Sequence, residues 1–457
     1  MAVAALMVLL GASGTAAQDG AERGENVFGN ALVPDMIADA SIQLINGTYY
    51  CNATTDGYGR GLDTSGPPTL WKSKDFANWS FDGTFIPSAA HEKYWAPSKI
   101  VEHSGRFYLY PTINGKMYAM VADHPDGPFE YWGRNGQMGD KAAAKLLPEG
   151  ERGIDAEIFV DDDGKKYIFW NNRHVARLHD DMVTIDSTTV LPSRHNVYSE
   201  GPIFFKRGEI YYCLYTLGGD EQYQYAYMTS RVSPMGPYET PEHDIIATTD
   251  QASGVYGPGH GCVFENSDGQ YYFAFLEFSR RSTNRQTYVC KMEFNTDGTI
   301  RPIRLNLNGV GVLGKANGAK WLQPKSVEAS SVKSPEFIEP MKDPSCRRTE
   351  YFNPEFAADG MNGSRWMAQD DDPSPTLTID LGKKTKIRRS EICFVRPTAG
   401  HAYTLETSAD GKHWTICGGH NDVRKQSPHV DKIKGRHRYL RVTITSGVKG
   451  IWEWHIR

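Results

Sequence analysis

Short apolar and aromatic runs alternate with glycine-centred turns from about residue 35 to residue 300. The same motif recurs five times in this stretch: a turn glycine followed by an aromatic-rich strand. A further short apolar segment precedes each glycine, so each repeat is predicted to open with a β-hairpin. The five turn glycines are Gly47, Gly105, Gly164, Gly208 and Gly269.

Each repeat is long enough for further strands after its hairpin, as in the segments 69–73, 117–122 and 225–230. Four-stranded repeats of this size are typical of the blades of a β-propeller. Five hairpins in an unrelated sandwich are the alternative, but the constant internal order favours radial closure. We therefore expect an all-β, five-bladed β-propeller over residues 25–310.

The repeat also aligns residues that can carry chemistry. In a propeller the first strand of each blade lines a central channel, so the residues that enter these strands converge. Counting back eight or nine positions from the turn glycines places three acids, a proline and a histidine in equivalent positions. These residues are Asp39, Pro97, Asp155, Glu200 and His260.

Three carboxyl groups in one channel cannot all ionise at their ordinary pKa, because like charges repel and dry sites favour the neutral form. One acid can then donate a proton while another accepts one, which is what glycosidic cleavage needs. A calcium site is the alternative, although such sites usually draw their ligands from one compact loop. Asp35 and Glu157 are rival acids outside the repeat register.

Composition agrees with short strands and tight turns, since the 457 residues include 45 Gly and 25 Pro and 12% of them are aromatic. The length exceeds that of most single cores, so a second domain is expected. A formal net charge of -5 and a pI near 6.3 predict no basic field for phosphates or anionic lipid. We expect a monomer with no nucleic-acid partner and no membrane insertion.

Residues 1–17 are predicted to be a signal peptide, because an apolar run from Ala2 to Leu10 precedes small residues. A frayed terminus or a membrane anchor is the alternative; the run is short for a bilayer span, and no Lys or Arg precedes it. A secreted, periplasmic or cell-surface location follows from the prediction. The seven cysteines include no C-x-x-C pair, and one bridge, between Cys393 and Cys417, is conceivable.

Strand periodicity is lost over residues 311–348, which collect Lys, Ser, Pro and Glu and are predicted to form a linker. Segments beyond it, such as Ala358–Trp366 and Tyr403–Trp414, resemble the discoidin, or coagulation factor 5/8 type C, fold. The resemblance implies a jelly-roll β-sandwich over residues 349–457. Such domains often bind glycans beside a catalytic module, so this one is a candidate carbohydrate-binding module or a structural appendage.

The sequences around the aligned residues resemble glycoside hydrolase family 43. The matching segments, in order along the chain, are Ile37–Ile42, Tyr94–Pro97, Ile154–Gly164, Ser199–Pro202 and Gly257–Gly261. The resemblance implies an inverting enzyme in which Asp39 is the general base and Glu200 the general acid. It makes Asp155 the residue that orients and tunes this acid. Asp-Ala stands at Asp39 and at Asp155 where the family has Asp-Pro, which removes two backbone constraints.

Three further site residues are expected, two of them from the same resemblance and Trp95 from its aromatic ring. His260 is similar to the family's central-channel histidine, which lies near a bound metal ion or water. Trp95 is expected to stack on a sugar face, or alternatively to be a core tryptophan. Arg285 is expected to donate hydrogen bonds to substrate hydroxyls, or alternatively to be a surface arginine.

We therefore predict a secreted glycosidase that removes terminal α-L-arabinofuranosyl or β-D-xylosyl residues from plant oligo- or polysaccharides. The alternatives are an exo-β-galactosidase acting on galactan or arabinogalactan, an inactive glycan-binding propeller, and a metal-stabilised scaffold. The predicted chemistry requires no cofactor, and a structural Ca²⁺ in the channel is a candidate.

Overall fold

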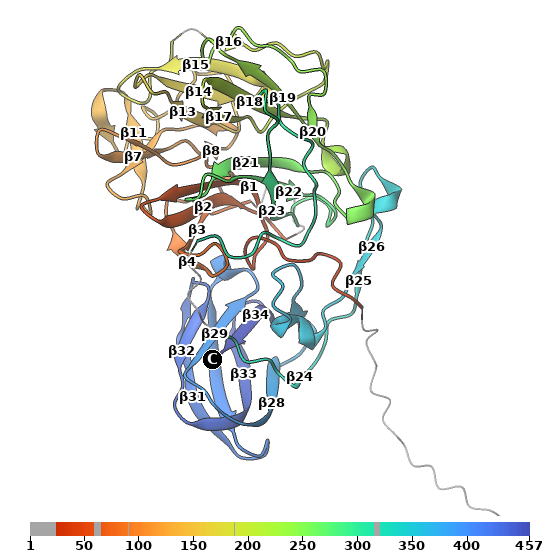
Figure 1. The fold of residues 1–457 in the computed structure, drawn as a ribbon. Coiled ribbons are helices and arrows are strands. Elements are labelled where there is room, and N and C mark those ends of the chain that lie inside the picture. Colours follow the sequence, from red (N-terminus) through yellow and green to blue (C-terminus); the bar gives the residue numbers. More distant parts are fainter. Residues whose placement is uncertain (1–23, 59–64, 90, 187, 315–319) are drawn as a thin grey trace, which may run out of the picture.

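The computed structural model describes residues 24–58, 65–89, 91–186, 188–314 and 320–457. The predicted signal peptide lies outside these residues. The described chain forms two β-rich units, with the N-terminal unit (β1 to β23) above the C-terminal unit (β24 to β34) in Figure 1. The all-β class is confirmed, because the helices among the described residues are short 3-10 turns. These are η2 (Arg134–Gly136), η3 (Asn171–Arg173), η4 (Asp220–Gln222), η5 (Gln251–Ser253), η6 (Pro344–Cys346), η7 (Pro354–Ala358) and η8 (Pro397–Ala399).

Five sheets follow one another in the N-terminal unit. The first contains β1 (Ile37–Ile45), β2 (Thr48–Thr55), β3 (Thr69–Ser73) and β4 (Trp79–Thr84). The second contains β6 (Val101–His103), β7 (Arg106–Leu109), β10 (Met120–Ala122), β11 (Glu130–Gly133) and β12 (Gln137–Met138). A small sheet beside it contains β5 (Tyr94–Trp95), β8 (Thr112–Ile113) and β9 (Lys116–Met117).

The other three sheets have the same meander order as the first. The third contains β13 (Glu157–Val160), β14 (Lys166–Trp170), β15 (His174–Leu178) and β16 (Thr189–Val190). The fourth contains β17 (Ile203–Arg207), β18 (Ile210–Leu217), β19 (Gln224–Ser230) and β20 (Ile245–Ala247). The fifth contains β21 (Gly259–Glu265), β22 (Tyr271–Glu277) and β23 (Gln286–Met292).

Each of the five sheets contains the predicted hairpin. The strands of β1–β2, β6–β7, β13–β14, β17–β18 and β21–β22 pair antiparallel across the five turn glycines. Each turn glycine has a positive φ, from 57° at Gly208 to 80° at Gly164. Glycine adopts this left-handed region without strain, so these residues mark the turns reliably.

The first strands of the sheets lie next to one another inside the N-terminal unit. β1 contacts β21, β17 contacts both β21 and β13, and β13 contacts β6. The backbone N–H of Ile100, just before β6, donates to Oε1 of Gln43 in β1 at 3.0 Å, which joins the second sheet to the first. The residues that enter these strands are therefore brought into one region.

The C-terminal unit is a β-sandwich. One sheet has the order β24-β28-β33-β30-β31 and the other the order β27-β34-β29-β32. Apolar side chains of both sheets, including Trp366, Leu377, Phe394 and Leu440, fill the space between them. The strands are β24 (Ser326–Ala329), β27 (Trp366–Met367), β28 (Thr376–Lys386), β29 (Arg389–Phe394), β30 (His401–Ser408), β31 (Trp414–Arg424), β32 (His429–Lys432), β33 (Arg436–Ser446) and β34 (Gly450–Ile456).

The segment expected to be a linker contains regular structure, which corrects that prediction. β24 pairs with β28 at the edge of the sandwich, and β25 (Glu336–Ile338) pairs with β26 (Arg348–Glu350). β24 buries one side chain, Val327, so its apolar pattern is too short to identify from sequence. We call residues 336–350 the arm; it runs up the side of the molecule towards the N-terminal unit (Figure 1).

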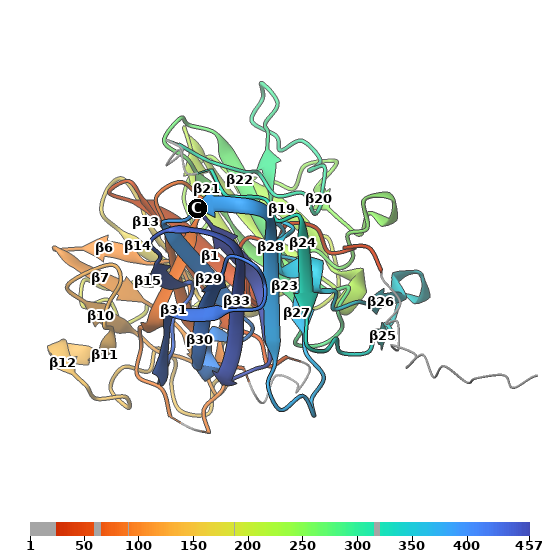
Figure 2. The same ribbon diagram turned by 90° about the horizontal axis from the view of Figure 1, so that it is seen from below.

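The two units share a packed junction, which Figure 2 views from the side of the C-terminal unit. Phe81 and Ser427 exchange two backbone hydrogen bonds of 2.6 and 2.9 Å across it. Nδ2 of Asn362 donates to the carbonyl of Ala31 at 3.0 Å. An apolar cluster fills part of the junction, formed by Met36, Cys393, Val395 and Trp452. These contacts hold the two units in one arrangement.

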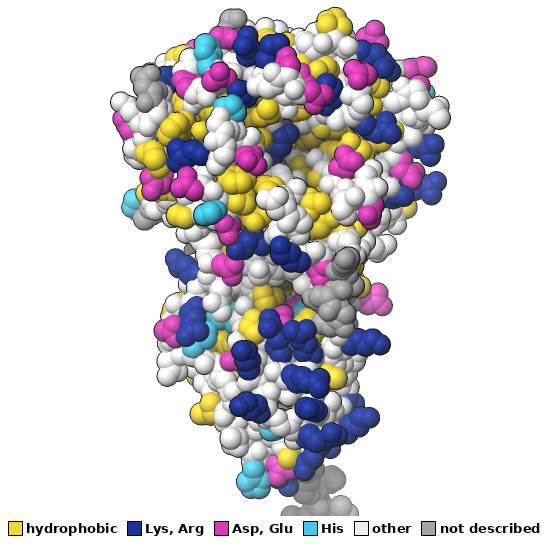
Figure 3. Space-filling view, turned by 60° about the vertical axis from the view of Figure 1, so that its left-hand side comes forward, with side chains coloured by type: hydrophobic (Ala, Val, Ile, Leu, Met, Phe, Trp, Pro, Cys, Tyr) yellow, Lys and Arg dark blue, Asp and Glu magenta, His cyan; other side chains and the backbone are white. Residues whose placement is uncertain are grey.

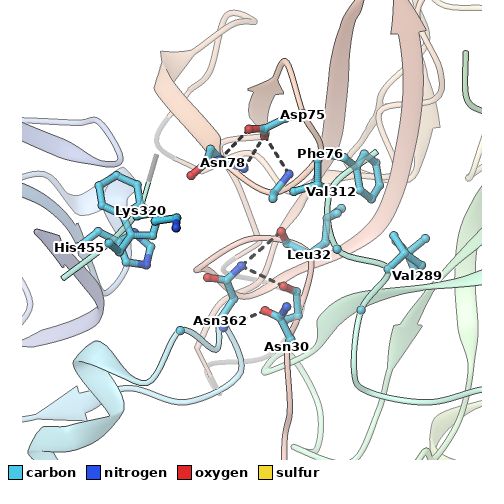
Figure 4. Close-up of a pocket in the computed structure, with 17 residues that line it drawn as sticks. Asn30, Leu32, Asp75, Phe76, Asn78, Val289, Val312, Lys320, Asn362 and His455 are labelled. Atoms are coloured by element: carbon cyan, nitrogen blue, oxygen red, sulfur yellow. Dashed lines mark hydrogen bonds between the residues drawn. The ribbon is translucent and has the colours of Figure 1, made fainter. Parts of the chain in front are cut away.

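A cavity of about 430 Å³ also lies at the junction (Figure 4). Asp75 and Asn78 line it from the N-terminal unit, and His455 lines it from the C-terminal unit. The ring of Trp321 stacks on that of His455, with centroids 4.8 Å apart. None of the predicted site residues lines this cavity, so the candidate chemistry lies elsewhere.

All seven cysteines lie in the described part of the chain and are free thiols, so the conceivable Cys393–Cys417 bridge is absent. Six of them are buried, as expected for cysteines that act as small apolar side chains. Among the described residues, no helix has the length and apolar character to cross a bilayer.

Candidate active site

A cavity of about 250 Å³ lies in the N-terminal unit where the first strands begin. Five of the six predicted site residues line it, and the sixth, His260, lies within 3.6 Å of two of them. The structure therefore brings together residues that are up to 246 positions apart in sequence. The lining residues are Asp39, Trp95, Ile154, Asp155, Glu200, Asp220, Tyr223, Phe278, Ser282, Thr283, Arg285 and Met341.

Two of the acids sit at backbone kinks. Asp39 has a φ of 52° and Asp155 a φ of 60°, both in the left-handed region. In β1 the kink coincides with a shift of register between Ala38 and Ser41. Non-glycine residues in this region store strain, which persists only where the surrounding structure holds it and is common at functional sites.

Three buried threonines hydrogen-bond to the backbone of residues at the site. The side-chain oxygen of Thr112 accepts from the N–H of Asp155 at 3.1 Å, and that of Thr216 accepts from the N–H of Glu200 at 3.0 Å. Thr54 accepts from the N–H of Ala96 at 2.8 Å and donates to Oδ2 of Asp39 at 2.7 Å. These hydrogen bonds fix the acids in place, and no sequence pattern predicted them.

Glu200 is the acid whose protonation is best defined. Burial raises its pKa to about 7, and the negative charge of Asp155 adds to this effect. The hydroxyl of Tyr223 donates to Oε1 of Glu200, which partly offsets the rise. A carboxyl group with a pKa near 7 retains its proton in a large fraction of molecules at neutral pH.

Asp155 and Asp39 differ in their surroundings. Burial, together with the charge of Asp39, raises the pKa of Asp155, whose Oδ2 accepts from the N–H of Gly201 at 3.1 Å. Oδ2 of Asp39 accepts from Thr54 and lies 3.6 Å from Nη2 of Arg285. Asp39 is thus held by a side-chain hydrogen bond beside a guanidinium, whereas Asp155 is held by a backbone N–H.

Arg285 is not the surface residue of the alternative interpretation. It is 7% exposed, and its guanidinium binds Asp56 with two hydrogen bonds of 3.0 and 2.8 Å. Its backbone N–H donates to the same carboxylate at 2.8 Å. Burial alone would lower the pKa of Arg285, but Asp56 and Asp39 raise it, so the side chain stays charged. Asp56 thereby positions Arg285 beside Asp39.

His260 stands in β21 between two of the acids. Its Nδ1 lies 3.5 Å from Oδ2 of Asp155 and 3.6 Å from Oδ1 of Asp39, and it has no hydrogen-bond partner among the described residues. Burial lowers its pKa against the opposing effect of the nearby acids. The ring packs on the backbone of Gly201, where a Cβ would meet it at 2.8 Å.

A directly coordinated metal ion does not fit the described residues. They contain no group of three or more His, Cys, Asp or Glu side chains placed to hold one. The nearby carboxylate of Glu157 is occupied by the ammonium of Lys99 at 2.7 Å, which also donates to the carbonyl of Phe204 at 3.1 Å. A metal held through water at His260 stays a prediction.

The two rival acids lie away from the cavity lining. Asp35 is buried near the junction, where the Tyr58 hydroxyl donates to it and the N–H of Arg396 donates to the same hydroxyl at 3.1 Å. Burial raises the pKa of Asp35 to about 7. Glu157 is paired with Lys99, as described above. Both acids therefore have structural partners.

The sequence patterns did not predict Asp56, Tyr223, Phe278 and Met341 as site residues. Tyr223 and Phe278 lie just outside the hairpins, in segments with no periodic pattern. Met341 belongs to the arm, and Glu221 brings it to the cavity by accepting from the N–H groups of Met341 and Lys342 at 2.7 and 2.9 Å. No local signal in the sequence marks such long-range contacts.

Three carboxyl groups in one cavity, two of them with a raised pKa, are the groups that acid and base catalysis of glycosidic cleavage uses, so the site is that of a glycosidase. Residues 28–300 match the family described as "Glycosyl hydrolases family 43", and residues 326–456 match "F5/8 type C domain". The chain belongs to glycosyl hydrolases family 43. Both resemblances drawn from the sequence are thereby confirmed.

The proteins similar to this one match different lengths of the chain. A solved structure named "Glycoside hydrolase" is 60% identical, covers 95% of this chain and 100% of its own, and has a TM-score of 0.91. "Beta-D-galactofuranosidase xynD" of Aspergillus niger is 30% identical over 62% of this chain and 86% of its own length. "Arabinoxylan arabinofuranohydrolase" of Paenibacillus polymyxa is 23% identical, and the match spans 64% of this chain and about half, 48%, of that protein.

Proposed function

We propose that this glycosidase removes terminal α-L-arabinofuranosyl residues, or β-D-xylosyl residues, from plant polysaccharides with inversion at the anomeric carbon. Glu200 gives its proton to the glycosidic oxygen as the bond to the anomeric carbon breaks. Asp39 takes a proton from a water molecule, whose oxygen bonds to the opposite face of that carbon. Asp155 keeps the acid protonated through its charge and orients it through Gly201.

The observation that carries this proposal is the pairing of Glu200, with its pKa of about 7, with Asp39 in one cavity. Acid and base catalysis requires one group that gives a proton and a second that accepts one, and these are the roles proposed for Glu200 and Asp39. Arg285 supports Asp39 as a carboxylate and leaves the rest of its donor fork for a substrate hydroxyl. Trp95 supplies an aromatic wall for the sugar ring.

The substrate proposal rests on cavity size and on relatives. A cavity of about 250 Å³ is smaller than the roughly 300–1,000 Å³ of pockets for drug-sized ligands, so it suits one terminal sugar. Arabinoxylan arabinofuranohydrolase of Paenibacillus polymyxa supports an arabinofuranosyl unit. The galactofuranosidase relative supports a second candidate, a terminal β-D-galactofuranosyl unit, which shares its ring configuration with α-L-arabinofuranose.

The proposal includes the architecture and location expected from the sequence. The five successive sheets are the five blades of the catalytic propeller, and the C-terminal sandwich is an accessory module. The protein is exported after removal of residues 1–17 and acts as a monomer outside the cytoplasm. The contacts that link the first strands of the sheets to one another support the assignment of the five sheets as propeller blades.

The test is hydrolysis of a panel of nitrophenyl α-L-arabinofuranoside, β-D-xyloside, β-D-galactoside and β-D-galactofuranoside. Proton NMR of the first-formed anomer distinguishes inversion from retention. Glu200→Gln and Asp39→Asn should abolish turnover, whereas Asp35→Asn, a matched change in an acid outside the cavity, should preserve it in the folded protein. Retention of configuration, or full activity of Glu200→Gln, would overturn the assigned roles.

A further inference from the structure

The two units differ sharply in charge. Residues 320–457 contain 23 Lys and Arg against 17 Asp and Glu, whereas the preceding 319 residues contain 27 against 38. The overall charge of -5 therefore combines an acidic N-terminal part with a basic C-terminal part. Figure 3 shows Lys and Arg side chains gathered over the visible face of the C-terminal unit, with few acids among them.

Much of this excess lies on two adjacent turns, β28–β29 and β32–β33. Hydrogen bonds tie the turns together, since the N–H of Ile387 donates to Gly435 and the N–H of Ile433 donates to Arg388. Seven basic side chains of these turns are exposed, and we call them the basic surface. They are Lys383, Lys384, Lys386, Arg388, Lys432, Lys434 and Arg436.

None of the seven forms an ion pair with another described residue, although neighbouring arginines do. Arg438 pairs with Asp380 at 2.7 Å and Arg441 with Glu406 at 2.8 Å. Arg389 is neutralised by Glu391. Asp380, Glu406 and Glu391 are thus paired with arginines outside the basic surface, and Asp431 accepts from the hydroxyl of Tyr403 at 2.5 Å and from the N–H of Gly419 at 2.9 Å. The seven cations remain available to an external anion.

The strand register places like charges against each other. Lys386 lies directly opposite Arg436 in the β28–β33 pair, and Lys432 lies opposite Arg389 in the β29–β32 pair. Like charges in direct cross-strand positions destabilise a sheet. Contacts that destabilise the fold are expected mainly at functional sites. A bound polyanion would neutralise the facing cations and remove the repulsion between them.

We propose that the basic surface binds the carboxylates of a uronic-acid-bearing polysaccharide and holds the catalytic unit on an acidic glycan matrix. The choice of a polysaccharide rests on the glycosidase activity of the N-terminal unit. Residues 381–389 and 431–437 contain no Trp, Tyr or Phe on which bases could stack, and their two isoleucines, Ile387 and Ile433, are buried. The surface therefore lacks both a platform for single-stranded nucleic acid and an apolar wedge for a membrane.

The attraction between the basic surface and a polyanion also offsets the repulsion between that polyanion and the N-terminal unit. The N-terminal unit carries the acidic excess and would by itself be repelled by a polyanion at low ionic strength. Binding through several exposed cations releases counterions, so it should weaken steeply with salt. Neutral galactan offers no such charge and serves as the matched ligand.

The test measures binding of the full chain to polygalacturonate and to linear galactan by affinity electrophoresis at 50 and 200 mM NaCl. Binding to polygalacturonate alone is expected, with about a tenfold or greater loss of affinity between the two salt concentrations. The double variant Lys384→Glu/Lys434→Glu should bind about tenfold more weakly. Lys74→Glu/Lys412→Glu, which changes the net charge equally at exposed sites elsewhere, should change affinity less than twofold.

Hydrolysis of nitrophenyl glycosides by the same variants should be unchanged, so failure of the binding proposal is distinguishable from failure of the proposed function. Absence of binding at 50 mM salt, or equal binding to galactan, overturns the proposal. Equally tight binding to duplex DNA or to phosphatidylglycerol vesicles of matched charge overturns the assigned class of partner.

Discussion

The hydroxyl of Tyr223 donates a hydrogen bond to Oε1 of Glu200 across the candidate active site. The hydrogen bond favours the charged form of Glu200 and so opposes the rise in its pKa that burial causes. In Tyr223→Phe this pKa should rise further, and the alkaline limb of kcat/KM should move to higher pH. The pH profile on a nitrophenyl glycoside checks this, because that limb reports the acid of the free enzyme. A shift to lower pH would contradict it.

Glu200→Gln should lose at least about 100-fold in kcat while gaining stability at alkaline pH. The folded protein binds the Glu200 proton with a pKa of about 7, against the ordinary 4.5 of an unfolded chain. This group therefore lowers stability as pH rises from about 4.5 through 7. Gln does not titrate, so the Tm of the variant relative to wild type should be higher at pH 8 than at pH 5. An equal difference at both pH values would contradict the assigned pKa.

Asp56→Asn should destabilise the protein and reduce activity. The substitution leaves the buried guanidinium of Arg285 without its charged partner, which costs about 3–5 kcal/mol in comparable buried pairs. Urea unfolding measures the free energy. Asp82→Asn, a change in an exposed acid of the same sheet, is the control and should cost less than about 0.5 kcal/mol. A loss of similar size in both variants would refute the assigned role of Asp56.

Thr216 is predicted to be a positioning residue for the acid. Thr216→Val leaves the N–H of Glu200 without its partner at a buried site, which costs about 1–3 kcal/mol. The displaced acid should lower kcat and shift the alkaline limb of the pH profile. Thr216→Ser retains the hydroxyl and should restore both the limb and the rate. A purely structural role would lower Tm without moving the limb.

Met341 is predicted to contact the part of the substrate beyond the terminal sugar. It is exposed, it lines the cavity, and its backbone is anchored by Glu221. Met341→Ala should lower kcat/KM on branched oligosaccharides about 5- to 30-fold, because it removes roughly 1–2 kcal/mol of apolar contact. Inhibition by the free monosaccharide should change less than twofold. An equal loss for both ligands would place Met341 against the terminal sugar instead.

The basic surface shows how an overall charge can conceal a local one. A net charge of -5 predicted no basic field, yet seven exposed cations lie on two neighbouring turns of the C-terminal unit. The prediction failed because net charge averages over both units. Only the β28–β33 and β29–β32 pairings show that cations some 50 positions apart in sequence lie opposite one another.

The sequence by itself determined the five hairpins and the positions of Asp39, Asp155 and Glu200 at their entry. Hairpin turns and strand alternation are local properties, so a glycine and a period of two suffice to identify them. Tertiary structure alone decided which partners these acids meet. Asp56 and Arg285 are 229 residues apart, and the arm reaches the cavity only when distant segments pack together. The pKa values and the neutralisation of charge depend on that packing, because burial and distance set them.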